Sequence, residues 1–170
     1  MTSEANRAYV MEKIDVMTGN DVGTKVNNDD MLNHATTEEE AWENIISSLD
    51  IELPQFFYWP SGFDYEDCTV DIGSQTAIVQ YVNNGNSIYF MINCNAKSAS
   101  FLATSDLGKK LEELNSDLIE DVDLTLWEVM EEGDELPTYI LQWEYKNVYY
   151  ELSGKISETD MEKIANNIMY

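Results

Sequence analysis

The sequence predicts an α+β domain, in which helices pack on one face of a curved antiparallel sheet of about five or six strands. Two observations lead to this prediction. Several runs of residues alternate between apolar and polar side chains with the two-residue period of a strand, and short turns join some of them. Two other runs begin with a helix-capping residue and continue with apolar residues at helical spacing. No segment recurs at a period of roughly 20–50 residues, which excludes repeat architectures.

The chain divides into a polar N-terminal part and one domain. Residues 1–35 are expected to form an N-terminal segment and a polar loop, because residues 19–30 consist largely of Gly, Asn and Asp. The apolar residues before that loop fit a strand and a helix equally well, so both remain open. Residues 36–170 are expected to form a single α+β domain, since single cores of about this size are common.

The first helix is predicted to begin after Thr37. The Thr37 hydroxyl can accept a hydrogen bond from the amide of Glu40, and the Glu40 carboxylate can accept one from the amide of Thr37, which is a capping box. Pro54 prevents the helix from continuing. The apolar stripe of this helix comprises Trp42, Ile45, Ile46 and Leu49.

Two strands follow, over Thr76–Val82 and Ser87–Asn93, and the Asn-Gly turn between them predicts a hairpin. Leu107, Leu111, Leu114 and Leu118 then recur at helical spacing, which predicts a second helix over Asp106–Leu118.

An antiparallel meander and a closing helix complete the predicted domain. Its three strands are expected at Val122–Met130, Thr138–Tyr145 and Val148–Leu152. Ser157 then caps the last helix, whose apolar stripe is Met161, Ile164, Ala165 and Ile168.

The formal charge of the chain is −24, from 33 Asp plus Glu against 9 Lys plus Arg. Such a chain repels nucleic acids and anionic lipid headgroups, so no nucleic-acid partner is expected. Lys and Arg are missing from Val26 to Ala96 and again from Leu111 to Tyr145. No run approaches the ~20 apolar residues of a membrane span. We therefore expect the chain itself to be soluble, with membrane contact only through an anchor outside it.

The residue types that carry catalysis are few. If the hairpin is centred between Asn84 and Gly85, Cys94 lies opposite Gln75, and if a preceding strand turns near Gly73-Ser74, Cys68 lies opposite Tyr81. The two sulfurs would then be too far apart for a disulfide, so both cysteines are predicted to be free and mostly buried. The single histidine, His34, lies in the polar loop, where a positioned base is not expected. The run Asp121–Thr125 has the spacing of a phosphotransfer motif but precedes its strand, and no catalytic residue is predicted.

Two acidic loops offer oxygen ligands for calcium. Neither has the twelve-residue loop of an EF-hand, so no metal and no cofactor is predicted. The candidate ligands that these loops supply are Asp29, Asp30, Glu131 and Asp134.

Aromatic residues alternate along the predicted strands. Tyr139, Trp143 and Tyr145 should share one face of a strand with Leu141. Most such rings are expected in the core beneath the helices. These three residues are nevertheless the candidate binding face for an apolar peptide, a lipid or a sugar.

The segment Tyr58–Gly62, the run Trp143–Ser157 and the helix that ends at Ile168 resemble the bacterial domain-of-unknown-function family 4367. The resemblance extends from about Thr37 to Ile168. It implies the extracytoplasmic C-terminal part of a Gram-positive membrane-anchored protein, in some cases with an anti-sigma-factor-like N-terminal region. It implies no catalytic residues.

Taken with the missing catalytic constellation, this resemblance predicts a non-enzymatic sensor or interaction domain, associated with the cell envelope, whose ligand is a protein, a peptide or an envelope component. The alternative is a secreted, calcium-dependent carbohydrate-binding or hydrolase-like module, since paired carboxylates serve glycosidases.

Overall fold

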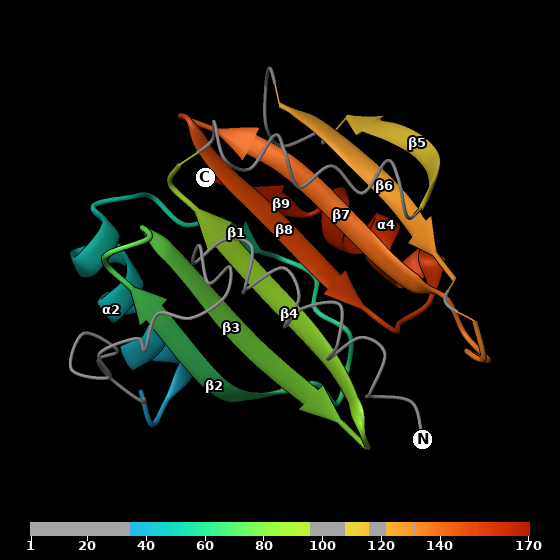
Figure 1. The fold of residues 1–170 in the computed structure, drawn as a ribbon, viewed down its shortest axis with the longest axis horizontal. Coiled ribbons are helices and arrows are strands. Elements are labelled where there is room, and N and C mark those ends of the chain that lie inside the picture. Colours follow the sequence, from blue (N-terminus) through green and yellow to red (C-terminus); the bar gives the residue numbers. More distant parts are fainter. Residues whose placement is uncertain (1–34, 96–107, 116–121, 131) are drawn as a thin grey trace, which may run out of the picture.

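The computed structural model describes residues 35–95, 108–115, 122–130 and 132–170 (Figure 1). The helices are α2 and α4, and the strands are β1 to β9. Their bounds are, in chain order, α2 (Glu38–Leu49), β1 (Gln55–Phe56), β2 (Asp64–Asp71), β3 (Thr76–Asn83), β4 (Asn86–Asn93), β5 (Lys109–Asn115), β6 (Asp123–Val129), β7 (Thr138–Tyr145), β8 (Val148–Gly154), α4 (Glu158–Ala165) and β9 (Ile168–Met169).

The main sheet has seven strands in the order β2-β3-β4-β8-β7-β6-β5, and all neighbouring strands are antiparallel. The pairing of β4 with β8 joins the N-terminal hairpins to the C-terminal meander. Helix α2 contacts β2 and β3, helix α4 contacts β7, and both helices lie behind the curved sheet in Figure 1. The α+β fold with helices on one face is therefore confirmed, with more strands than the five or six predicted.

The turn residues explain why the chain forms tight hairpins between neighbouring strands. Asn84 and Gly85 both have positive φ, 46° and 87°, which is the conformation of the tight turns that join twisted antiparallel strands. Lys146 and Asn147, with φ of 49° and 63°, form an equivalent turn between β7 and β8. In the turn between β2 and β3, the Asp71 carboxylate accepts hydrogen bonds from the amides of Gly73 and Ser74, at 2.8 and 3.1 Å.

Helix α2 begins where its capping residue predicts. The Thr37 hydroxyl accepts from the Glu40 amide at 3.2 Å. The return bond of the predicted capping box is displaced by one residue, because the Glu40 carboxylate accepts from the amide and hydroxyl of Thr36, at 3.0 and 2.7 Å. These bonds, rather than burial, lower the pKa of Glu40. The buried residues of α2 are Ala41, Ile45 and Leu49. Ile46, which the predicted stripe included, is exposed.

The predicted helix over Asp106–Leu118 is wrong. Its described part, Lys109–Asn115, is strand β5, paired with β6. The register shifts between Lys110 and Glu112, so Leu111 is an extra residue in the strand. Because of this bulge, Leu111 and Leu114 both pack against the main core, although they are three residues apart. The bulge therefore gives this strand the spacing of apolar residues that is typical of a helix.

The C-terminal helix α4 is capped by Ser157, whose hydroxyl accepts from the Asp160 amide at 3.0 Å, as predicted. It ends at Ala165, earlier than its apolar stripe indicated. Ile168 is buried, but it belongs to β9 and pairs with Phe56 of β1. Asn167 ends the helix by donating its side-chain amide to the carbonyl of Lys163 at 2.8 Å.

The core has a large part and a small part. The large cluster fills the space between the sheet and the helices, and Phe90, Leu124, Leu141 and Leu152 are fully buried in it. A smaller cluster lies on the opposite face of the sheet and contains Tyr89, Met91, Val129 and Ile140. Both faces of β4 are consequently buried.

Candidate functional site

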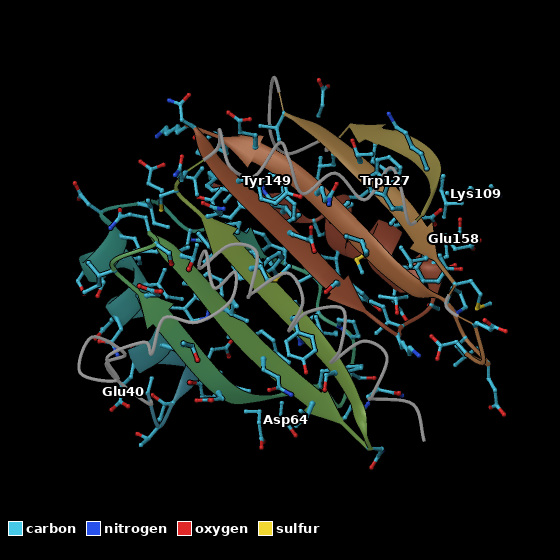
Figure 2. The ribbon with its side chains drawn as sticks, in the orientation of Figure 1. Glu40, Asp64, Lys109, Trp127, Tyr149 and Glu158 are labelled. Carbon is cyan, nitrogen blue, oxygen red and sulfur yellow. The ribbon has the colours of Figure 1, made fainter. Side chains whose placement is uncertain are left out.

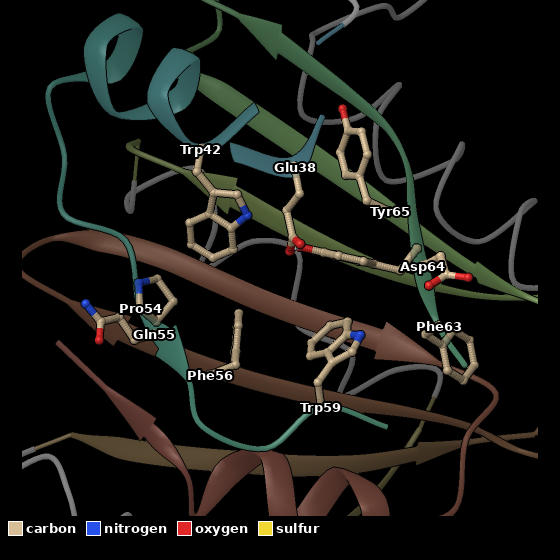
Figure 3. Close-up of a pocket in the computed structure, with 10 residues that line it drawn as sticks. Glu38, Trp42, Pro54, Gln55, Phe56, Trp59, Phe63, Asp64 and Tyr65 are labelled. Carbon is tan, nitrogen blue, oxygen red and sulfur yellow. Dashed lines mark hydrogen bonds between the residues drawn. The ribbon is translucent and has the colours of Figure 1, made fainter. Parts of the chain in front are cut away.

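A pocket of about 470 Å³ lies between α2, the segment that follows it, and the edge of the sheet at β2 and β3 (Figure 3). Six of its ten lining residues carry aromatic rings. The lining residues are Glu38, Trp42, Pro54, Gln55, Phe56, Trp59, Phe63, Asp64, Tyr65 and Tyr81.

The aromatic walls of the pocket hold one another in place. The Trp59 ring lies against Tyr81 and Phe56, with centroid distances of 4.6 and 5.4 Å. The Phe56 ring also meets Trp42 edge to face at 6.2 Å. Ring contacts of this kind stabilise by about 0.5–1.5 kcal/mol beyond their buried area. The pocket is thus largely formed before any ligand arrives.

The segment that carries Phe56 and Trp59 is anchored to the C-terminal residues. Phe56 pairs with Ile168 in the small β1–β9 sheet, and the amide of Phe57 donates to the carbonyl of Asn167 at 2.8 Å. Tyr58 donates its hydroxyl to Asp160 of α4 at 2.6 Å, and this bond is the main cause that lowers the pKa of Asp160. Two elements far away in the sequence therefore position one wall of the pocket.

The tyrosine hydroxyls of the pocket are already engaged. Tyr81 donates to Oε1 of Glu38 at 2.8 Å, and Tyr65 donates to the carbonyl of Ala35 at 2.9 Å. Burial, followed by the hydrogen bond to Glu38, raises the pKa of Tyr81. Burial also raises the pKa of Tyr65 to about 12. Both phenols thus stay protonated at neutral pH and keep their protein acceptors.

One polar atom of the pocket wall has no partner. Nε1 of Trp59 is buried and makes no hydrogen bond among the described residues. The carboxylates of Glu38 and Asp64 are the charged groups of the lining, and no Lys, Arg or His is among its ten residues. The pocket is therefore apolar in its walls and acidic in its charge.

The predicted binding face over Tyr139, Trp143 and Tyr145 lies on the helix side of β7, together with Leu141. Tyr139 and Trp143 are only 8% and 3% exposed. Trp143 stacks on Tyr150 and donates its indole N–H to the Tyr170 hydroxyl at 2.9 Å, while the Tyr145 ring stacks on Tyr170 at 3.8 Å. Tyr139 and Trp143 are therefore core side chains, whereas Tyr145 is partly buried and lines a second pocket of about 320 Å³.

Of the four candidate calcium ligands, only Asp134 lies within the described residues. It pairs with Lys155 at 2.7 Å, and the two side chains are 13% and 2% exposed. An ammonium group thus already neutralises this carboxylate. Asp29, Asp30 and Glu131 lie outside the described residues, as does His34. Within the described part of the chain, no three His, Cys, Asp or Glu residues gather in a group that could hold a metal.

Both cysteines are free, as predicted, and Cys68 is buried while Cys94 is partly exposed. The Cys94 amide donates to the Gln75 carbonyl at 3.0 Å, in agreement with the predicted register. Cys68 pairs with Val79 and not with Tyr81, because the turn between β2 and β3 is centred between Gly73 and Ser74, so that Asp71 lies opposite Thr76. Burial raises the pKa of the Cys68 thiol to about 12, which makes it a poor nucleophile at neutral pH.

The pocket residues were not predicted as a site. The sequence shows their signal only indirectly: four consecutive aromatic residues, 56–59, stand between Pro54 and Pro60, and a capped helix precedes them. Glu38 lies in the first turn of the predicted helix, where a carboxylate favours the helix start. Nothing local to the sequence indicates that Glu38 meets Tyr81, which is 43 residues away.

Comparisons with known proteins give one family. The model of the family described as Domain of unknown function (DUF4367) matches residues 53–168. No curated protein and no solved structure matches the chain significantly. The match begins after α2, later than the resemblance from Thr37 indicated, so Glu38 and Trp42 lie outside it and the other pocket residues lie inside it.

No helix within the described residues is long and apolar enough to cross a membrane. The family match covers more than half of the chain and includes every strand of the main sheet. It also includes all three segments on which the resemblance was based. The chain therefore belongs to the domain-of-unknown-function family DUF4367.

Proposed function

We propose that this chain is a non-enzymatic interaction domain, and that its ligand, a protein, a peptide or a cell-envelope component, inserts a side group into the pocket between α2 and β2. The observation that carries the proposal is the pocket itself: about 470 Å³, walled by six rings and anchored by the β1–β9 pairing. Pre-formed, mostly apolar pockets with a few polar groups are the usual form of a binding site.

The chemistry of the described residues supports binding over catalysis. The pocket tyrosines are protonated donors with acceptors already in place, and the Cys68 thiol is buried and protonated at neutral pH. A nucleophile with a neighbouring base, which covalent catalysis requires, is not among the pocket residues.

The proposal places the full-length protein outside the cytoplasm, at the cell envelope, as the outer part of a membrane-anchored regulator. The support is the resemblance of the run Trp143–Ser157 to extracytoplasmic, in some cases anti-sigma-factor-like, proteins of Gram-positive bacteria. The charge of −24 supports a partner other than nucleic acid.

Retention of envelope material tests this proposal. We would immobilise the wild-type chain, a Trp59→Leu variant and a Phe57→Ala variant, and measure how much labelled Gram-positive envelope extract each retains. Phe57 is the matched control, because it is an aromatic residue of the same segment, is 61% exposed and does not line the pocket. Trp59→Leu should lose most of the specific retention, and Phe57→Ala should keep it.

Melting curves of the three proteins check that each is folded. If the folded Trp59→Leu variant retains as much envelope extract as the wild type, the pocket is not the binding site. Hydrolysis of envelope glycans by the wild type would contradict the non-enzymatic assignment.

The alternative, a secreted calcium-dependent carbohydrate-binding or hydrolase-like module, has one observation in its favour. Glu38 and Asp64 line the same ring-walled pocket, and glycosidases use two carboxylates across a cleft. Calcium at matched ionic strength should then raise the melting temperature relative to EDTA, and Glu38→Gln should abolish any glycoside hydrolysis.

A further inference from the structure

We infer that the group entering this pocket is a cation, an alkylammonium or guanidinium such as the side chain of a lysine or an arginine. The inference rests on the proposed function, because it assigns the charge of the group that the same pocket receives. It adds the chemical class of the ligand, which the existence of a pocket alone does not give.

The first step is the position of Glu38. It is the first residue of α2, and Figure 3 shows its carboxylate in the space between Trp42 and Trp59. Among the described residues only the Tyr81 hydroxyl donates to it, at one oxygen, with a distance of 2.8 Å. The other oxygen is left to accept from a ligand. Asp64 stands at the rim of the pocket, beside Phe63, and adds a second negative charge.

The second step is that none of the described residues lining this pocket carries a positive charge. All ten lining residues fall between Glu38 and Tyr81, inside the stretch from Val26 to Ala96 that contains no Lys or Arg. The contrast with Asp134 is direct, because Lys155 neutralises that carboxylate at 2.7 Å. A positive charge in the pocket would therefore have to come from residues outside this stretch, and a ligand is the natural source.

The third step concerns hydrogen bonds. The hydroxyls of Tyr65 and Tyr81 already donate to protein acceptors. The carboxylates that line the pocket are acceptors only. A ligand rich in donors fits such a site, whereas a phosphate or carboxylate ligand would meet two like charges. A neutral sugar needs acceptors and donors together, whereas the carboxylates of Glu38 and Asp64 offer acceptors only and the unpartnered donor, Nε1 of Trp59, is buried.

The fourth step is the rings. Ammonium and guanidinium groups are attracted to the faces of aromatic rings, and Trp binds them best. The chain uses this contact elsewhere, with Lys146 at 5.2 Å from the Tyr145 ring centroid and Lys163 at 5.4 Å from that of Tyr58. Trp42 and Trp59 lie on two sides of the Glu38 carboxylate (Figure 3). Rings and carboxylate together favour an organic cation over a metal ion, whose hydration shell rings cannot replace.

The test uses capped single residues as probes. Nα-acetyl-lysine and Nα-acetyl-arginine methylamides would be titrated into the full chain at ~150 mM NaCl, where the general attraction of a negative surface is screened beyond about 8 Å. The Nε-acetylated lysine probe keeps the length and loses the charge. Tryptophan fluorescence and backbone amide NMR shifts report binding. The charged probes should bind about tenfold more tightly than the neutral one, which corresponds to ~1.4 kcal/mol.

Matched variants separate the pocket from the net charge. Glu38→Gln keeps an acceptor for Tyr81 and removes the charge, whereas Glu39→Gln removes the same charge from the next residue of α2, outside the pocket lining. Glu38→Gln should weaken the charged probes about tenfold, and Glu39→Gln should change their affinity less than twofold. Equal weakening by the two variants would overturn the inference, because only the overall field would then act.

The remaining outcomes are also decisive. Equal affinity for charged and neutral probes, or no binding of the charged ones, overturns the cation assignment. The retention assay with Trp59→Leu judges the proposed function independently, so a binding pocket with an uncharged ligand would be recognised as such. Butylammonium serves as a free-amine probe: binding equal to that of the capped lysine identifies a free amine as sufficient, and weaker binding assigns the cation to a peptide side chain.

Discussion

Two ion pairs of this chain, Lys155–Asp134 and Lys146–Glu52, differ sharply in how deeply their charges are buried. Lys155 is 2% exposed and its partner Asp134 13%, whereas Lys146 and its partner Glu52 are 57% and 61% exposed. The ion-pair distances are almost equal, 2.7 and 2.8 Å. Removing one member of a buried pair leaves an uncompensated charge in the interior, while an exposed charge is solvated by water.

Lys155→Met should therefore lower the free energy of unfolding by about 3–5 kcal/mol. The matched Lys146→Met should lower it by at most about 1 kcal/mol. Urea unfolding measures both. The double variant Lys155→Met with Asp134→Leu should recover most of the loss, because no lone charge remains buried. Similar losses for the two single variants would contradict this account of the pair.

The Cys68 thiol makes the fold sensitive to alkali. Its pKa is about 12 in the folded chain against an ordinary value of 9.0, because the thiol is buried. Above pH 9 the unfolded chain loses this proton and the folded chain keeps it, so stability falls as pH rises from 9 to 12. The slope contributed by one such group is about 1.4 kcal/mol per pH unit.

Cys68→Ala should therefore flatten the decline between pH 9 and pH 12, measured by urea unfolding at fixed ionic strength. The slope should not vanish, since burial also raises the pKa of Tyr81. Cys94→Ala is the comparison: burial raises the pKa of this thiol as well, but Cys94 is partly exposed, so its substitution should flatten the decline less than Cys68→Ala does. An unchanged slope in Cys68→Ala would show that this thiol does not stay protonated in the folded chain.

Whole elements were predictable where their signals are local. Both helix starts follow from Thr37 and Ser157, because a capping hydroxyl acts on an amide only three residues away. The hairpin at Asn84-Gly85 is local in the same sense. Strand β5 was not predictable, because its bulge at Leu111 depends on the pairing with β6, which no local pattern in the sequence indicates. The pocket was missed for the same reason, since its walls come from α2, β1, β2 and β3.

The cap of α2 also bears on the pocket, because Glu38 is the first residue of the helix. Thr37→Ala should destabilise the chain by about 1 kcal/mol in urea unfolding. It should also weaken the charged probes, because a frayed first turn no longer holds Glu38 in position. The control is Ser47→Ala, which removes a hydroxyl from an exposed position of the same helix. If both variants bind the probes like the wild type, the cap does not position Glu38.

At the scale of the whole molecule, the negative charge has two roles. It is spread over the surface, as the labelled carboxylates Glu40 of α2, Asp64 of β2 and Glu158 of α4 show (Figure 2). It also acts at one pocket, which Glu38 and Asp64 line and to which the stretch without Lys or Arg supplies every lining residue. The sequence alone revealed the charge gap, but only the fold reveals that aromatic rings gather around it.

A net charge of −24 on 170 residues should make the fold sensitive to salt, because like charges repel one another more in the compact state than in the extended chain. Raising NaCl from about 10 to about 200 mM shortens the Debye length from ~30 to ~7 Å. We expect the free energy of unfolding to rise by about 1–2 kcal/mol, which corresponds to a rise in melting temperature of roughly 2–8 °C for a chain of this size. The rise should shrink at pH 4, where many carboxylates are protonated.

Calcium chloride at equal ionic strength is the second comparison, and a much larger rise in melting temperature with calcium would favour a bound cation. A melting temperature independent of NaCl at pH 7 would mean that self-repulsion does not limit the stability of this fold.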